Sequence, residues 1–397
     1  MNYENWISCR YLIASKGRFL SFLNFISIAG VAVGVTALIV VTGIMTGFGN
    51  NLREKIIGTT AHISVEKETG ISNYKDLQKQ LKSVEGVIGA SPYIQGNIFL
   101  ESEGQALGLS IRGVDPQTEK DVTKVDEYLT EGKLTDLGKG GIIIGKELAR
   151  YYDFKLGDKV TLIAPGSGMA GRGWRYELPI AGIFNTGMVD YDMHLVIVSI
   201  KKAQEIFDLP ENKVSGIGVS VVNPYQVKEI KQKVYQLLGY SFFVKTWIDI
   251  NRNLFEALFL EKWGLFIILT LMILVASFNI ISTLIVTVTT KIHDIGILQS
   301  FGVSKQSIRR IFTKQGIFIG VLGTFWGLVG GIGISFILRT YIEVPAEIYS
   351  IDHVPVELQL QDVLIIVACA MVISYLATIY PAAKAAQLEP VEALRYE

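Results

Sequence analysis

Four long runs without a charged residue stand out along the chain. They cover Phe19–Leu52, Trp263–Thr290, Gln315–Leu338 and Val363–Ala383. A helix rises about 1.5 Å per residue, so about 20 residues cross the roughly 30 Å hydrocarbon core of a membrane. The pattern therefore predicts four transmembrane helices, with spans at 22–47, 263–290, 315–338 and 363–383.

The short loops between these runs predict an orientation, because Lys and Arg collect on the cytoplasmic side. The flank 1–21 is basic and mixes aromatic with cationic residues, which is typical of an interfacial amphipathic helix. The loop 291–313 is also basic, whereas the loop 339–361 is acidic. We therefore expect both termini, with the tail 384–397, in the cytoplasm, and the segment 48–262 on the opposite, external side.

The segment 48–262 alternates short apolar runs with polar turns, which indicates a soluble domain of mixed strands and helices. Strand–helix–strand patterns in 53–115 and 214–258 flank a β-rich middle at 116–213. We expect one subdomain made of the two flanking pieces, with a second inserted into it. The predicted fold class is thus a polytopic α-helical membrane protein with a large mixed α+β domain between its first two spans.

Composition excludes several functions. Lys plus Arg and Asp plus Glu both number 37, and this balance gives no reason to expect nucleic-acid binding. Two cysteines cannot make a disulfide scaffold, and four histidines leave little material for a metal site. A P-loop, a G-x-S-x-G elbow and an H-E-x-x-H motif are all missing from the sequence. We therefore expect a non-catalytic chain that binds no cofactor itself.

Two local patterns imitate binding motifs. Gly166–Gly171 matches G-x-G-x-x-G, but the sequence after it predicts a strand rather than the helix that a dinucleotide site requires. Asp190, Asp192 and His194 alternate along VDYDMH, which we interpret as a strand. A metal site there is the weaker interpretation, and ordinary structural roles are favoured.

The spans are rich in small residues and contain no ionisable Asp, Glu, Lys or Arg. Glycines at four-residue spacing let helix backbones approach and pack. Missing charges argue against a proton or ion pathway. The spaced glycines are Gly30 and Gly34, Gly43 and Gly47, Gly316 and Gly320, and Gly323, Gly327 and Gly331.

The loop between the second and third spans predicts a short helix. Ile292, Ile295 and Leu298 have helical spacing, Gly302 suits the position just after a helix, and Ser304 suits the N-cap of the next one. A short helix held between two spans is suited to insert into a groove of a partner. The alternative is a basic interface helix without a partner.

This loop also carries a family resemblance. KIHDIGILQSFGVSKQSIRRIFTKQGIFIGVLG resembles the coupling segment of FtsX/MacB-type ABC transporter permeases, and within them the lipoprotein-releasing LolC/LolE permeases. Residues 26–48, Ser91–Ile94, Ile111–Pro116 and the ending from Tyr380 to Glu397 are similar to that family in the same order.

The resemblance implies a permease subunit that extracts lipid-anchored lipoproteins from the inner membrane of a Gram-negative bacterium. It implies a second permease copy or paralogue, a cytoplasmic LolD-like P-loop ATPase that binds ATP–Mg, and a periplasmic LolA-like carrier. It also implies mechanical coupling from the ATPase to the external domain. The alternatives are a MacB-like export or mechanotransmission permease and an FtsX-like regulator of a periplasmic hydrolase.

By the same resemblance, three groups of residues have expected roles. The ATPase-coupling residues are Asp294, Ile295, Gly296, Ile297, Leu298, Phe301, Gly302 and Ser304. The residues of span packing and the lipid cavity are Gly30, Gly34, Gly43, Gly47, Phe278 and Ile281. A carrier-binding loop falls in 165–176, with a plain hairpin tip as the alternative, and its candidate residues are Met169, Arg172, Trp174 and Arg175.

Overall fold

The computed structural model describes residues 3–13, 18–102, 104–164, 174–342 and 354–387. Two compact units divide the chain. One contains the long helices, from the N-terminal region to Gly49 and again from Glu256 onward; the other contains Asn50–Phe255. These limits lie within a few residues of the ends expected for the domain.

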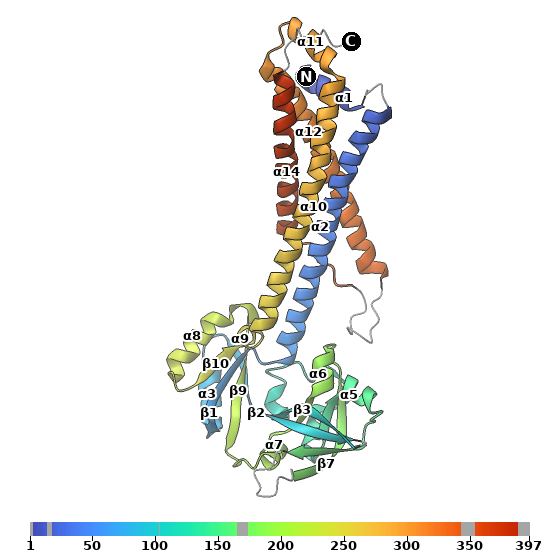
Figure 1. The fold of residues 1–397 in the computed structure, drawn as a ribbon. Coiled ribbons are helices and arrows are strands. Elements are labelled where there is room, and N and C mark those ends of the chain that lie inside the picture. The colour runs from blue at the N-terminus through green and yellow to red at the C-terminus, as the bar shows by residue number, and fades with distance from the viewer. Residues whose placement is uncertain (1–2, 14–17, 103, 165–173, 343–353, 388–397) are drawn as a thin grey trace. The chain divides into compact units, whose positions relative to one another are not determined.

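Among the described residues, four helices are long and apolar enough to cross a membrane (Figure 1). Each contains one of the predicted charge-free runs. Helices α2 and α10 continue beyond the expected spans, so the first residues assigned to the domain, up to Thr59, are helical. The four helices are α2 (Arg18–Thr59), α10 (Arg252–Thr290), α12 (Lys305–Tyr341) and α14 (Leu360–Ala386).

The N-terminal helix α1 (Tyr3–Ile13) packs against α12, a contact that its interfacial pattern did not predict. Glu4 is 6 % exposed and accepts a 2.7 Å hydrogen bond from Lys314 Nζ. That bond, opposed by burial, holds the pKa of Glu4 below its ordinary value. Trp6 stays half exposed, so one face of the helix remains free for a membrane surface.

The domain is built on one ten-stranded sheet, ordered β10-β1-β9-β2-β3-β8-β5-β7-β4, with β6 pairing β2 and β7. Its strands are β1 (Ile63–Ser72), β2 (Val87–Ser102), β3 (Gln105–Val114), β4 (Leu129–Gly132), β5 (Ile142–Gly145), β6 (Lys159–Ala164), β7 (Trp174–Phe184), β8 (Leu195–Ser199), β9 (Lys213–Val221) and β10 (Phe243–Thr246).

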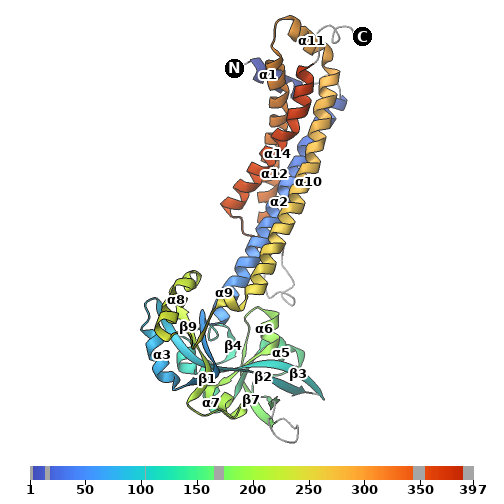
Figure 2. The same ribbon diagram turned by 60° about the vertical axis from the view of Figure 1, so that its left-hand side comes forward.

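Both expected subdomains contribute strands to this one sheet. Strands β10, β1 and β9, from the flanking pieces, form one end, and the strands from the middle of the segment form the other. The 16-residue strand β2 pairs with β9 at its start and with β3 and β6 farther on, so it belongs to both parts. Figure 2 shows the strands of the two parts meeting at β2.

Short helices lie over or between the strands of the domain. They are α3 (Tyr74–Lys82), α4 (Pro116–Glu119), α5 (Lys146–Tyr151), α6 (Val189–His194), α7 (Ile200–Ile206), α8 (Val227–Leu238) and α9 (Trp247–Ile250), with 3-10 turns at Leu134–Lys139 and Pro224–Gln226. The predicted strand at VDYDMH is wrong, because these residues form α6. The strand predicted at Leu178–Phe184 is confirmed, because it lies within β7, which begins at Trp174.

Helix α12 contacts two neighbours through two different sets of glycines. A β-carbon added at Gly316 or Gly320 would meet Thr378 or Ser374 of α14. A β-carbon at Gly323, Gly327 or Gly331 would meet α2 instead; at Gly327 it would lie 2.6 Å from Val35 Cβ. The missing side chains thus allow close packing on both sides, as helices in a membrane require.

The pair Gly43 and Gly47 does not serve helix packing, which corrects the prediction for that pair. Both face the extended segment Pro355–Leu358, which precedes α14. Glu357 N–H donates a 3.0 Å hydrogen bond to Gly43 O, so the segment is fixed to α2 through backbone atoms. The pair Gly30 and Gly34 does face a helix, since added β-carbons would meet Ala276 and Ile273 of α10.

We predict that Gly327→Ala lowers the melting temperature of the protein in detergent. Its new methyl would overlap Val35, and such overpacking typically costs about 1–3 kcal/mol. Gly333→Ala is the matched control, because its β-carbon would enter open space and alanine favours helix by up to about 1 kcal/mol. Equal shifts in the two variants, measured by scanning fluorimetry, would contradict close packing at Gly327.

Candidate functional site

The short helix α11 (Ile292–Ser300) is joined to both neighbouring spans with almost no intervening chain. Lys291 alone separates it from α10, and four residues separate it from α12. Gly302 has φ +86° and closes the helix: its N–H donates to Gln299 O and the Val303 N–H donates to Leu298 O. This Schellman arrangement confirms the position predicted for Gly302.

The N-cap predicted at Ser304 is also confirmed. Its hydroxyl oxygen accepts a 3.2 Å hydrogen bond from Ser307 N–H at the start of α12. At the other end of α11, Lys291 Nζ lies 2.8 Å from Asp294 Oδ2. The first bond caps α12, and the ion pair joins the first turn of α11 to the residue that connects it with α10.

Burial divides the predicted coupling residues into two groups. Ile295 is fully buried with Val288, Ile308 and Phe312, and Gly296 is buried beside it. These two hold α11 against the bundle and offer no surface to a partner. Ile297 and Phe301 point outward instead, and Phe301 is 83 % exposed.

Helix α10 presents an uncovered apolar stripe. Phe278, predicted at the lipid cavity, is 55 % exposed, whereas Ile281 is half-buried against the helix core. The exposed side chains at three- and four-residue spacing are Trp263, Ile267, Leu271, Leu274 and Phe278. A continuous apolar face of this kind suits lipid, acyl chains or another apolar helix.

A charged pair joins Lys262 of α10 to the first turn of α14. Lys262 Nζ lies 2.9 Å from Asp362 Oδ2 and 3.1 Å from Thr46 Oγ1 of α2, and the Thr46 hydroxyl donates to Asp362 at 3.2 Å. Three of the four long helices therefore meet at one hydrogen-bonded group. Lys262 and Asp362 each stand directly before a predicted charge-free run, so their positions and opposite charges were a usable signal that the sequence analysis missed.

Known proteins match this architecture in both units. The model of the MacB-like periplasmic core domain matches residues 24–237, and that of the FtsX-like permease C-terminal matches residues 266–390. The lipoprotein-releasing system transmembrane protein LolC of Neisseria meningitidis serogroup B is 32 % identical over 99 % of both chains. The chain belongs to the LolC/LolE family of FtsX/MacB-type permeases.

Further relatives agree with this assignment. LolC of Xylella fastidiosa strain 9a5c is 30 % identical over 98 % of both chains, and LolE of Haemophilus influenzae is 27 % identical over 99 % of both. The chain is therefore the permease subunit of a lipoprotein-releasing ABC system. It is a multi-pass inner-membrane protein with a periplasmic domain, as the resemblance implied.

The expected carrier-binding loop of the permease lies mostly outside the described residues, Met169 and Arg172 included. Its last part begins β7. Trp174 is 67 % exposed there, while Arg175 Nη2 lies 2.8 Å from Glu101 Oε1 on β2. Of these two residues, Trp174 therefore exposes most of its side chain, whereas Arg175 is held in an ion pair.

Asp192 has a structural role in the permease. It is fully buried and accepts hydrogen bonds from the N–H groups of Thr186 and Gly187 and from the Thr186 hydroxyl. Burial still raises its pKa above the ordinary value, against these bonds. Within the described ranges, no group of three His, Cys, Asp or Glu residues could hold a metal ion.

His62 is likewise structural. Its Nδ1 accepts a 3.0 Å hydrogen bond from Val221 N–H, which fixes a neutral ring in the domain core. Burial lowers the pKa of His62 to about 4, so the ring stays uncharged at neutral pH.

We predict that Asp362→Asn lowers the unfolding free energy of the permease by about 1–2 kcal/mol, because a hydrogen-bonded charge is lost while Lys262 remains. The double variant Lys262→Asp, Asp362→Lys should recover part of this loss, as paired residues do. Glu261→Gln, at the exposed neighbouring position, is the control. Equal melting temperatures for Asp362→Asn and Glu261→Gln in detergent would contradict the role of the pair.

Proposed function

We propose that the permease extracts lipoproteins from the inner membrane and passes them to a periplasmic carrier, driven by a separate ATPase that docks on α11. In this arrangement the termini and α11 are cytoplasmic and the domain is periplasmic. The basic loops predicted from the sequence support that orientation. ATP–Mg is bound by the partner, and this chain supplies docking, coupling and substrate contact.

The observation that carries this proposal is the attachment of α11. Ile295 anchors it in the bundle, and its two ends continue almost directly into α10 and α12. A partner that pushes on Ile297 or Phe301 therefore moves two long helices together.

The acyl chains of the substrate are expected to lie on the apolar faces of α2 and α10. Helix α2 exposes Phe22, Phe25 and Val33, and α10 exposes the stripe that contains Phe278. A second permease copy or paralogue placed against these faces would enclose an apolar cavity. Within the described part of the chain, the bundle of one copy leaves both faces uncovered.

The two other permease functions fit less well. Relatives with full-length matches are named for lipoprotein release, which favours that function over MacB-like export. The same names favour lipoprotein release over an FtsX-like regulator of a hydrolase.

We predict that Phe301→Asp reduces co-purification of the ATPase at least tenfold and leaves the melting temperature unchanged. The Phe301 side chain is 83 % exposed, so the change removes partner contact and not internal packing. Ile295→Asp should lower both the co-purification of the ATPase and the melting temperature, because it places a charge in the buried cluster. Gln306→Asp, at an exposed position of α12, is the control and should preserve both.

Co-purification of the ATPase with Phe301→Asp at the wild-type level would refute docking on this face. A second experiment tests the whole activity. Proteoliposomes that contain the permease, its ATPase and a lipoprotein should release the lipoprotein to a soluble carrier only with ATP. ATP hydrolysis without release would contradict the proposed function.

A further inference from the structure

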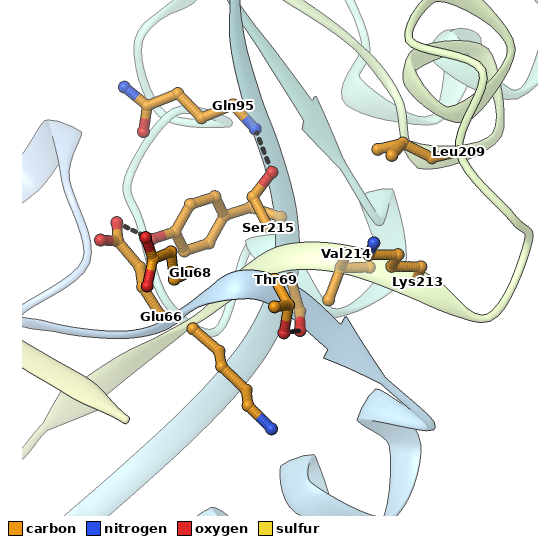
Figure 3. A pocket seen from close by; sticks show the side chains of 11 residues that line it. Glu66, Glu68, Thr69, Gln95, Leu209, Lys213, Val214 and Ser215 are labelled. Carbon is orange, nitrogen blue, oxygen red and sulfur yellow. Dashed lines mark hydrogen bonds between the residues drawn. The ribbon is translucent and has the colours of Figure 1, made fainter. Parts of the chain in front are cut away.

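Two hollows on the domain sheet share a border. Their volumes are about 520 Å³ and about 440 Å³, and Glu66 and Tyr93 line both. In the larger hollow, shown in Figure 3, the Tyr93 hydroxyl donates a 2.8 Å hydrogen bond to Glu66 Oε1. The Gln95 N–H donates one of 3.2 Å to Ser215 Oγ, and Glu66 also pairs with Lys245. These contacts join neighbouring strands, so they indicate a role in the fold.

The N-terminal helix α1, in contrast, has contacts that a helix on a membrane surface does not need. Glu4, Ser8 and Tyr11 share one of its faces, because they follow one another at four- and three-residue spacing. Glu4 and Ser8 are buried, and Tyr11 is half-buried. A surface helix buries apolar side chains in lipid. A buried carboxylate is costly unless it is paired, so this face of α1 fits one particular neighbour.

Helix α12 supplies the partners of this face. Lys314 Nζ lies 2.7 Å from Glu4 Oε2, and Arg310 Nη1 lies 3.8 Å from Glu4 Oε1. The Tyr3 hydroxyl donates a 3.0 Å hydrogen bond to Ser307 Oγ. Ser307, Arg310 and Lys314 recur at three- and four-residue spacing and thus lie on one face of α12. A slide of α1 along α12 would break all three contacts, so they fix its register.

Near the other end of α1, Tyr11 reaches the support of α11. It packs against the buried cluster that contains Ile295, the anchor of α11, and its ring centre lies 6.3 Å from that of Phe312. Lys291, the residue between α10 and α11, places its Nζ 5.4 Å from the centre of the Tyr11 ring. Helix α1 therefore contacts both the junction of α10 and α11 and the cluster on which α11 is seated.

We propose that α1 positions α11 for the ATPase. Glu4 fixes α1 on α12, and Tyr11 in turn supports the junction of α10 and α11. The exposed side chains Ile297 and Phe301 are then held in one orientation before the ATPase binds, which reduces the entropy lost on docking. The inference rests on the proposed function, because it requires that the ATPase docks on α11. Glu4 and Tyr11 are positioning residues in this arrangement.

Titration with the ATPase tests this role in the full permease, held in nanodiscs that leave both faces accessible. In Tyr11→Ala, the ATPase concentration that gives half-maximal lipoprotein release should rise about fivefold or more, the order expected for loss of a ring contact to a cation. The maximal rate should stay within about twofold of wild type, because saturating ATPase selects the oriented α11. Tyr11→Phe keeps the ring and should match wild type. Trp6→Ala, on the exposed face of α1, is the control and should match it too.

The two parameters of this titration separate positioning from stability. If Tyr11 only stabilised the fold, Tyr11→Ala would reduce the amount of folded permease. The maximal rate would then fall while the half-maximal concentration stayed at the wild-type value. That result, or a titration of Tyr11→Ala that equals wild type in both parameters, would overturn the proposal.

Charge exchange gives a second test that applies even if Tyr11→Ala fails to fold. Glu4→Lys places like charges together and should raise the half-maximal concentration in the same way. Addition of Lys314→Glu to the same chain should restore most of the loss, as paired residues do. An equal rise with and without Lys314→Glu would contradict the role of Glu4. Equal ATPase binding by wild type and Phe301→Asp would instead refute the proposed function on which the inference rests.

Discussion

The close approach of α12 to α2 and α14 is the constraint on which the helical unit depends. Lipid tails are as apolar as the helix surfaces, so burial of apolar area supplies little force for association within a membrane. Helices in a membrane associate mainly through close van der Waals contact, and glycine permits their backbones to approach closely enough for it. Helix α12 uses this property on two faces, with Gly316 and Gly320 toward α14 and the three later glycines toward α2.

The packed long helices form the support on which the short helices α1 and α11 are held. Helix α1 is held on α12 by the buried carboxylate of Glu4, and α11 is held by Ile295. The pair of Lys262 and Asp362 joins three long helices at a separate place along the bundle. A force applied at α11 therefore acts on a set of connected helices rather than on a single loop.

Much of this organisation could be predicted from the sequence, because the signals were local. Charge-free runs, the glycine after α11 and the N-cap at Ser304 depend on neighbouring residues. Contacts between residues distant in the chain left weaker signals in the sequence. The sheet shared through β2, the seating of Pro355–Leu358 on Gly43 and the burial of Ile295 each depend on residues distant in the chain.

The same reason explains the errors in the domain. The alternation of Asp190, Asp192 and His194 resembled a strand, but the hydrogen bonds from Thr186 and Gly187 to the Asp192 carboxylate favour a helical turn that follows them. A cleft on the sheet face could not be recognised in the sequence, since its residues come from five strands, three helices and the segment between α2 and β1. Only the sheet order brings Glu66, Tyr93 and Arg112 together.

Helix α2 is unbroken over 42 residues, from Arg18 to Thr59, or about 63 Å at the usual rise. A continuous helix resists twisting as well as bending, since its backbone hydrogen bonds connect successive turns. A rotation imposed on one end of α2 would therefore be carried along its whole length to Thr59.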